Sequence, residues 1–138
     1  MFLVDTNVIS EARKGRAANR GVTAFFHLAA REGSPIYLSA ITVGELERGV
    51  RLIRHRGDHE QADLLMKWVM KIFHEYQDRI LPVDREVALI WGAMRVPHPE
   101  NSLDKLIAAT AWLNGLTLVT RNIKDFSQTG IPLINPFE

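Results

Sequence analysis

The fold class of this chain follows from one stretch near its start, Phe2-Leu3-Val4-Asp5-Thr6-Asn7-Val8-Ile9. Three apolar residues followed directly by an acid are typical of a short buried strand that ends at a polar residue. Thr6 and Asn7 are residue types that cap helices, and apolar residues continue after them. We therefore expect a buried strand that passes into a helix almost at once, with Asp5 at the junction.

The same alternation of short apolar strands and helices continues along the chain. Further strands are expected at 36–38, 80–83, 116–119 and 131–134. Helices are expected over about 22–31, 42–56, 58–76, 84–95 and 101–114. This order predicts βαβ units and an α/β fold, with a mostly parallel sheet that helices cover on both faces. No repeat or linker interrupts the 138 residues, which predicts a single domain over 1–138.

The composition excludes several classes of protein. With 46% hydrophobic and 24% charged residues, the chain has the composition of a globular domain. The absence of cysteine excludes a disulfide framework and thiolate metal sites, and it suits a reducing compartment such as the cytoplasm. A charge at Asp5 argues against a signal peptide, and no apolar run approaches the roughly 18 residues of a membrane span. We expect a cytoplasmic protein that makes no contact with membranes.

Positive charge gathers in the first part of the chain although the net charge is only +1. Residues 1–56 carry nine Lys or Arg against five Asp or Glu, a local balance of +4. The basic residues form two groups: Arg13, Lys14, Arg16 and Arg20, and then Arg48, Arg51, Arg54 and Arg56. Such groups can attract polyanions, but for a chain near neutrality a solvated helix face is the better explanation. Charge alone therefore indicates no function.

Four acids occupy positions that a parallel sheet would bring together: Asp5, Glu45, Asp104 and Asp125. Three of them come shortly after expected strands, and Asp104 opens a helix that leads into a strand. Ligands of such sheets gather beyond the carboxyl ends of the strands. Carboxylates held within a few ångströms repel one another unless a cation joins them. Mg²⁺ fits this role, because it prefers oxygen ligands and assists phosphodiester hydrolysis.

Each acid also has an ordinary structural explanation, which the sequence leaves open. Asp5 could end a strand and cap a helix. Thr42-Val43-Gly44-Glu45 matches a capping box, in which Glu45 would bond to the backbone of Thr42. Asp104 gains from the dipole of its helix, and Asp125 could belong to a turn in which Asn122 is the cap. The argument for a metal site therefore rests on the four acids together.

Four segments in order resemble PIN-domain toxins of the VapC type, including the FitB-like branch. The segments are Phe2–Glu11, Leu38–Leu46, Asp104–Ala111 and Leu118–Phe126. The resemblance covers nearly the whole chain. It implies a three-layer α/β/α sandwich and an RNA-cleaving site that uses Mg²⁺ or Mn²⁺. It also implies a homodimer whose site is blocked by a small cognate antitoxin.

Roles for single residues follow from the same resemblance. Asp5, Glu45 and Asp104 match the acid set of the family, and the resemblance implies that Asp5 and Asp104 are the direct metal ligands. Relatives carry a fourth acid at the position of either Asn122 or Asp125, so Asp125 inherits that role here. Polar support around the site is expected from Asn7, Thr120 and Asn122. Arg121 and Lys105 stand beside site acids and either hold the RNA backbone or are plain surface charges.

Other functions fit the residues less well. A phospho-receiver domain needs two acids after the first strand and a lysine after the fifth, and a haloacid-dehalogenase-like phosphatase needs a second Asp where Asn7 stands. Gly57-Asp58 breaks the helix between His55 and His59, which argues against a zinc pair. The tryptophans, Trp68, Trp91 and Trp112, are interpreted as core residues. Two alternatives stay open: a non-catalytic PIN-fold binding module, and a PIN nuclease of RNA processing that has no antitoxin.

Overall fold

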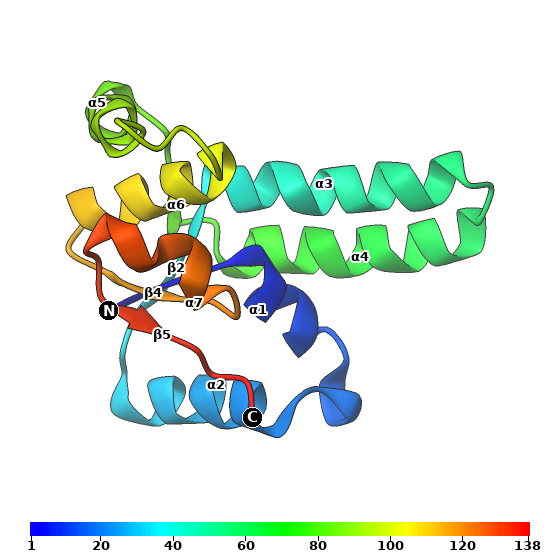
Figure 1. The fold of residues 1–138 in the computed structure, drawn as a ribbon. Helices are drawn as coiled ribbons and strands as arrows, with labels where there is room; N and C mark the ends of the chain where they lie inside the picture. The colour runs from blue at the N-terminus through cyan, green and yellow to red at the C-terminus, as the bar shows by residue number, and fades with distance from the viewer.

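A parallel sheet of five strands forms the centre of the molecule (Figure 1). The computed structural model describes residues 1–138. The strands lie in the order β3-β2-β1-β4-β5, and every pairing is parallel. Their bounds are β1 Phe2–Val4, β2 Ile36–Ser39, β3 Ile80–Leu81, β4 Thr117–Val119 and β5 Leu133–Ile134. All five expected strands are present, and the edge strands β3 and β5 are shorter than expected.

Helices cover both faces of this sheet. Their bounds are α1 Thr6–Ala12, α2 Arg20–Glu32, α3 Ala40–His55, α4 His59–Glu75, α5 Arg85–Met94, α6 Ser102–Leu113 and α7 Ile123–Phe126. Two short 3-10 turns are also present: Gly15–Ala17 (η1) follows α1, and Ser127–Thr129 (η2) follows α7. Five helices begin at a side-chain cap, which Asp5, Asn19, Ser39, Asp58 and Asp84 provide. No helix combines the length and the apolar character that crossing a membrane requires.

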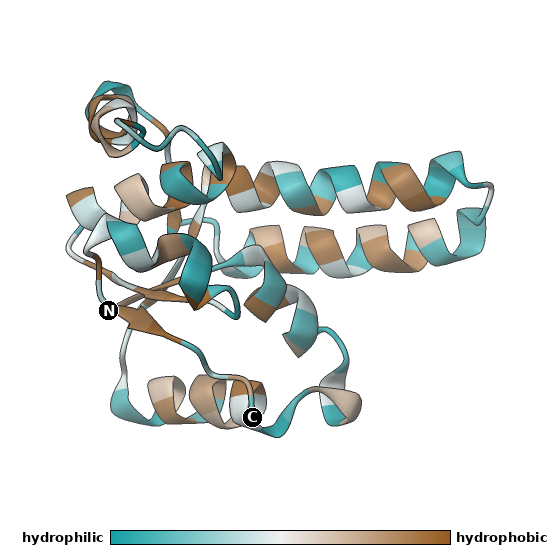
Figure 2. Ribbon diagram, in the orientation of Figure 1, coloured by the Kyte–Doolittle hydropathy of each residue, from teal (hydrophilic) through white to brown (hydrophobic).

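The core is divided into two clusters by the sheet. Neighbouring residues of a strand point to opposite faces, so Val4 packs into one cluster and Leu3 into the other. Helices α1 to α4 complete the first cluster, and α6 and α7 complete the second. In Figure 2 the central strands are hydrophobic and the outer ends of the helices are hydrophilic. The predicted α/β/α sandwich with a parallel sheet is therefore confirmed.

Helices α3 and α4 form a long antiparallel hairpin that extends away from the sheet (Figure 1). Gly57 makes the turn between them with φ +89°, a left-handed conformation that glycine adopts without strain. Arg54 and Asp63 form an ion pair across the hairpin, with 3.0 Å between Nη2 and Oδ1. The tip is exposed, and its residues are mostly charged or polar.

The tryptophans differ from the expectation that all three belong to the core. Trp68 packs against the first cluster. Trp91 is part-buried, and its indole N–H donates to the carbonyl of Ser102 at 2.8 Å. Trp112 is 56% exposed on α6, so the expectation is wrong for this residue. Its side chain lies on the outer face of a helix whose other faces are buried, and periodicity is weak in such an apolar helix.

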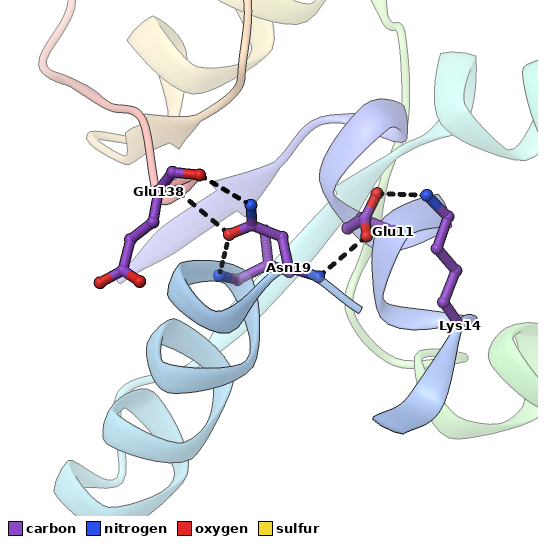
Figure 3. Close-up of polar contacts among 5 residues, drawn as sticks. Glu11, Lys14, Asn19 and Glu138 are labelled. Atoms are coloured by element: carbon purple, nitrogen blue, oxygen red, sulfur yellow. Dashed lines mark hydrogen bonds and ion pairs between the residues drawn. The ribbon is translucent and has the colours of Figure 1, made fainter. Parts of the chain in front are cut away.

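The C-terminal segment is attached to the beginning of α2 (Figure 3). Asn19 donates from Nδ2 to the carbonyl oxygen of Glu138 at 3.0 Å, and the backbone N–H of Glu138 donates to Asn19 Oδ1 at 3.1 Å. The same Oδ1 accepts from the backbone of Gly21 and so caps α2. A Cβ at Gly21 would lie 1.9 Å from the carbonyl oxygen of Pro136, so only glycine fits here. Asn19 therefore has two roles: it caps α2, and it holds Glu138 in place.

Candidate metal-dependent site

Asp5 lies where β1 ends and α1 begins, at the carboxyl edge of the sheet. Its side chain is 4% exposed and accepts three hydrogen bonds. The backbone N–H of Thr6 donates to Oδ1 at 2.8 Å, and the hydroxyl of Thr120 donates to Oδ2 at 2.8 Å. The amide of Asn7 lies 3.4 Å from Oδ2. Burial raises the pKa of Asp5 although these donors act in the opposite direction.

Thr120 and Asn7 connect Asp5 to the loop after β4. Thr120 is fully buried, and its Oγ1 accepts from the backbone N–H of Asn122 at 3.1 Å. Asn7 lies between two strand ends, because its Nδ2 is 3.4 Å from Thr120 Oγ1 and its Oδ1 accepts from the backbone N–H of Arg121 at 3.1 Å. The expected supporting residues thus surround Asp5, although Asn122 contributes its backbone and no side-chain cap. Their part in catalysis stays a prediction.

Glu45 reaches the same edge from α3, but the capping box expected at Thr42 is absent. The helix begins at Ala40, and Ser39 caps it by accepting from the backbone N–H of Ile41 at 3.0 Å. Thr42 is therefore inside the helix and buried. The carboxylate of Glu45 instead accepts a hydrogen bond from the hydroxyl of Thr6 at 2.9 Å. Partial burial is the main cause that raises the pKa of Glu45, and repulsion from Asp5 adds to it.

The pKa of Asp104 depends on the charges of the other three acids. This residue lies in the first turn of α6, a helix whose following residues are buried and mainly apolar. Burial raises the pKa of Asp104 to about 6, and repulsion from Asp5, Asp125 and Glu45 contributes in that order. Like charges raise a carboxyl pKa only when they are near. The expected convergence of the four acids is thus visible in the electrostatics of Asp104.

Asp125 approaches the site from the short helix α7. The fully buried Phe126 anchors this helix, whereas the side chain of Asp125 is exposed. The backbone N–H of Asp125 donates to the carbonyl of Asn122 at 3.0 Å, so the loop after β4 places the acid. Asn122 occupies the N-cap position of α7 but makes no side-chain cap.

The two candidate RNA-binding cations lie in different surroundings. Lys105 is 4% exposed, and its ammonium donates to the carbonyl of His98, which ties the loop before α6 to that helix. This burial and this bond argue against an RNA contact of Lys105, which stays a prediction. Arg121 is exposed, and its guanidinium lies 4.8 Å from the centre of the Phe137 ring. It therefore stays available at the edge of the site.

The donor set suits a hard cation, but the acids do not form a closed cage. No group of three or more His, Asp or Glu side chains is arranged to hold an ion by itself. Mg²⁺ does not need such a group, because it typically keeps several waters and binds one or two protein carboxylates together with substrate phosphates. The buried polar side-chain atoms all have hydrogen-bond partners. A bound cation would offset the repulsion among these acids, which contributes to the raised pKa of Asp104.

One residue that matters for this geometry, Thr6, is not among those expected from the sequence. Its hydroxyl holds Glu45 and also lies 3.1 Å from the hydroxyl of Thr42, which joins α1 to α3. The available signal was its place directly after Asp5, which a helix-capping role explained equally well. A side-chain contact across 39 residues follows from tertiary packing alone.

Comparisons with known proteins agree with this fold. The family model of the PIN domain matches residues 2–132. Toxin FitB of Neisseria gonorrhoeae is 34% identical over 142 residues, which cover 99% of each chain. The VapC ribonuclease Y4jK of Sinorhizobium fredii is 29% identical over 143 residues, which cover 100% of this chain and 99% of that relative.

Solved structures show the same similarity in three dimensions. The crystal structure of FitAcB from Neisseria gonorrhoeae superposes with a TM-score of 0.85 at 35% identity, covering 99% of this chain and 98% of that one. A toxin–antitoxin complex from Klebsiella pneumoniae gives a TM-score of 0.64 at 25% identity, covering 100% and 99%. The resemblance expected from the four sequence segments is confirmed.

Proposed function

The chain belongs to the PIN-domain family, and from that premise we propose that it is a Mg²⁺-dependent endoribonuclease acting as the toxin of a toxin–antitoxin pair. The reaction is hydrolysis of RNA phosphodiester bonds at the edge of the sheet where Asp5, Glu45, Asp104 and Asp125 meet. The observation that carries the proposal is the arrangement of acids after adjacent strands, with Asp5 directly after β1 and Glu45 held beside it by Thr6. The raised pKa of Asp104, caused by burial and by the three other carboxylates, agrees with this arrangement.

A divalent cation would relieve the repulsion among these acids. Asp5 and Asp104 would hold it, with Mg²⁺ as the expected ion and Mn²⁺ as a substitute. When bound, such an ion lowers the pKa of a water molecule and neutralises charge that develops on phosphate. Two observations support the assignment: the donors are all oxygens, and Asp5 is buried with its orientation fixed by Thr6 and Thr120.

The other side chains of the chain have distinct tasks in this proposal. Glu45, held by Thr6, accepts the proton of the attacking water or orients it. Asp125 assists near Asp104, since its charge acts on that acid. Attack in line with the leaving 3′ oxygen leaves a 5′ phosphate on the product. Arg121 is free to contact the RNA backbone at the edge of the site.

The proposed partners follow from the relatives. A VapC ribonuclease supports RNA as the substrate, and a toxin–antitoxin complex supports a cognate antitoxin as the inhibitor. We also propose a homodimer, as the resemblance implies, acting in the cytoplasm where its substrate would be. Light scattering on the purified chain, with and without antitoxin, measures these assemblies directly.

The test is cleavage of total cellular RNA by protein purified free of any partner. We expect cutting with Mg²⁺ or Mn²⁺, none in EDTA, and none for Asp5→Asn, which keeps the shape of the side chain. Asp78→Asn is the matched control, because Asp78 is exposed and makes no side-chain hydrogen bond or ion pair. Circular dichroism confirms that each variant is folded. Folded protein that cuts no RNA with any of these metals would contradict the proposal and favour a binding module.

A further inference from the structure

Two arginines outside the acid site, Arg16 and Arg20, line a hollow on the protein surface. The hollow lies between the end of α1, the turn η1 and the helix α2, and its two overlapping lobes measure about 450 and 320 Å³. Arg16 lines both lobes together with Thr23 and His27, and Arg20 lines the smaller one. No Asp or Glu is among the lining residues. The lining therefore combines the two cations with apolar residues, among them Ala12 and Phe26.

The donors of this hollow are free. The side chains of Arg16, Arg20, Thr23 and His27 take part in none of the hydrogen bonds or ion pairs of the protein. Some other basic residues are paired, as Lys14 is with Glu11 and Arg51 with Glu47. Two guanidinium groups, a hydroxyl and an imidazole are together suited to the oxygens of a phosphate group.

The hollow lies within reach of a strand bound at the acids. Helix α1 begins directly after its cap Asp5 and ends at Ala12, which lines the larger lobe. Seven residues of helix measure about 10 Å, so Asp5 lies about that far from the part of the hollow at Ala12. The one acid of this connection, Glu11, is compensated: Lys14 donates to it at 2.9 Å, as does the backbone N–H of Asn19 (Figure 3). These bonds lower the pKa of Glu11.

An RNA substrate needs such a site because the acidic edge repels it. The proposed site presents carboxylates to a phosphate, and Lys105, the basic residue next to Asp104 in the chain, is 4% exposed. We propose that the hollow formed by Arg16, Arg20, Thr23 and His27 binds a backbone phosphate of the RNA, one that flanks the cleaved bond. The proposal rests on the proposed ribonuclease function for its ligand, but it concerns binding and not the chemical step.

Salt dependence of RNA binding tests this site without any cleavage. The full chain carrying Asp104→Asn is titrated in EDTA with a fluorescent single-stranded RNA, and the affinity is followed from 50 to 200 mM KCl. Each neutralised phosphate of a single strand contributes about 0.7 to the slope of log K against log salt. We expect Arg16→Gln with Arg20→Gln to lessen that slope by about 0.7. The affinity should fall roughly 2- to 5-fold or more, the effect of an exposed ion pair.

Arg31→Gln provides the matched control on the same helix. Arg31 is exposed in the last turn of α2 and lies outside the hollow, so we expect the slope and affinity to stay as in the parent protein. Arg31→Gln removes one charge and the double variant two, so a loss in Arg31→Gln half as large as in the double variant would mean that only net charge matters, which would overturn the site. An unchanged slope in the double variant would also overturn it. If that variant then lost antitoxin binding, the hollow would belong to the protein partner.

The outcomes for the hollow and for the nuclease are separable. A smaller slope in a protein that cuts no RNA would support the hollow and contradict the proposed function. Metal-dependent cutting with an unchanged slope would support the proposed function and contradict the hollow. Inorganic phosphate at constant ionic strength is the remaining probe. One contrary result would be that phosphate stabilises the wild type but not the double variant in thermal melts, while the two proteins show the same salt slope for RNA binding. In that case the ligand of the hollow would be free phosphate, and the RNA proposal would fail.

Discussion

The hydroxyl of Thr6 donates a hydrogen bond to Oε1 of Glu45 at 2.9 Å and so connects the first turn of α1 to α3. One of these residues follows β1 and the other follows β2, and the two strands are adjacent in the sheet. The bond fixes a carboxylate whose side chain is otherwise exposed. Thr6 is thus a positioning residue, which holds the carboxylate of Glu45.

Replacing Thr6 with valine should reduce RNA cleavage without unfolding the protein. Valine keeps the branched shape but donates no hydrogen bond to Glu45. Partners that orient the groups of a metal site typically contribute 10- to 100-fold to activity or metal affinity, and we expect a loss of about that size. Single-turnover cleavage at saturating Mg²⁺ measures it. Thr6→Ser keeps the hydroxyl and should recover most of the rate, and a serine variant as slow as valine would refute this role.

Thr120→Val should weaken both the fold and the metal site. The substitution removes the donor to Asp5 Oδ2 and the acceptor of the Asn122 backbone N–H, all in a buried place. Leaving buried groups without partners costs about 1–3 kcal/mol of unfolding free energy. Urea denaturation followed by circular dichroism measures this loss. The Mg²⁺ concentration for half-maximal cleavage should rise as well, because the carboxylate loses the bond that favours its ionised form. Equal stability and equal metal dependence would contradict the assignment.

The stability of the metal-free protein should fall as the pH rises from about 4 to about 6. The folded pKa of Asp104 is about 6 and the ordinary value is 3.8, so the folded state holds the proton more tightly across this window. Stability from this source is complete below the ordinary pKa and is lost above the folded one. Because the side chain is only part-buried, solvent reduces the effect to about 1 kcal/mol.

Asp104→Asn removes the titrating group and provides the comparison. In EDTA at pH 7.5 we expect this variant to be more stable than the wild type by about 1 kcal/mol, with a flatter profile between pH 4 and 7. Thermal melts at several pH values measure both quantities. Adding Mg²⁺ should stabilise the wild type more than the variant, since a ligand stabilises the state that binds it. Parallel profiles for the two proteins would show that Asp104 is not the cause.

Gly21→Ala should destabilise the chain by roughly 1–3 kcal/mol, the usual cost of overpacking. The added methyl would lie 1.9 Å from the carbonyl oxygen of Pro136, which is backbone and cannot move alone. Gly49→Ala is the control, because its Cβ would meet only Leu65 Cδ2 at 4.0 Å inside helix α3. Alanine is preferred there by about 0.5–1 kcal/mol, so the two glycine variants should shift the melting temperature in opposite directions.

The overall architecture could be predicted because strand and helix signals are local. Phe2–Val4 and its four companion strands are short apolar runs, and the order of elements decides the parallel arrangement. The meeting of Asp5, Asp104 and Glu45 followed from the same logic, since parallel strands end at one edge. The comparisons with known proteins confirm the fold and the family, while the function of each acid stays a prediction.

What could not be predicted depends on contacts between distant segments. A capping box at Thr42 is a valid local pattern, but β2 ends at Ser39 and leads directly into the helix, which uses Ser39 instead. A lysine is normally expected at the surface, but the ammonium of Lys105 donates to the carbonyl of His98. Trp112 is equally misleading, since an apolar helix gives no indication of which side meets solvent.

The hairpin of α3 and α4 determines where this protein can be altered for experiments. Both ends of the chain are held, because Phe2 begins the central strand and Glu138 is bonded to Asn19. The turn at Gly57 is exposed on both sides and lies at the far tip of the hairpin (Figure 1). Exposed tips of this kind tolerate inserted sequence best. A fluorescent reporter or affinity peptide placed between Arg56 and Asp58 would follow the protein in cells while leaving the acids and the basic hollow in place.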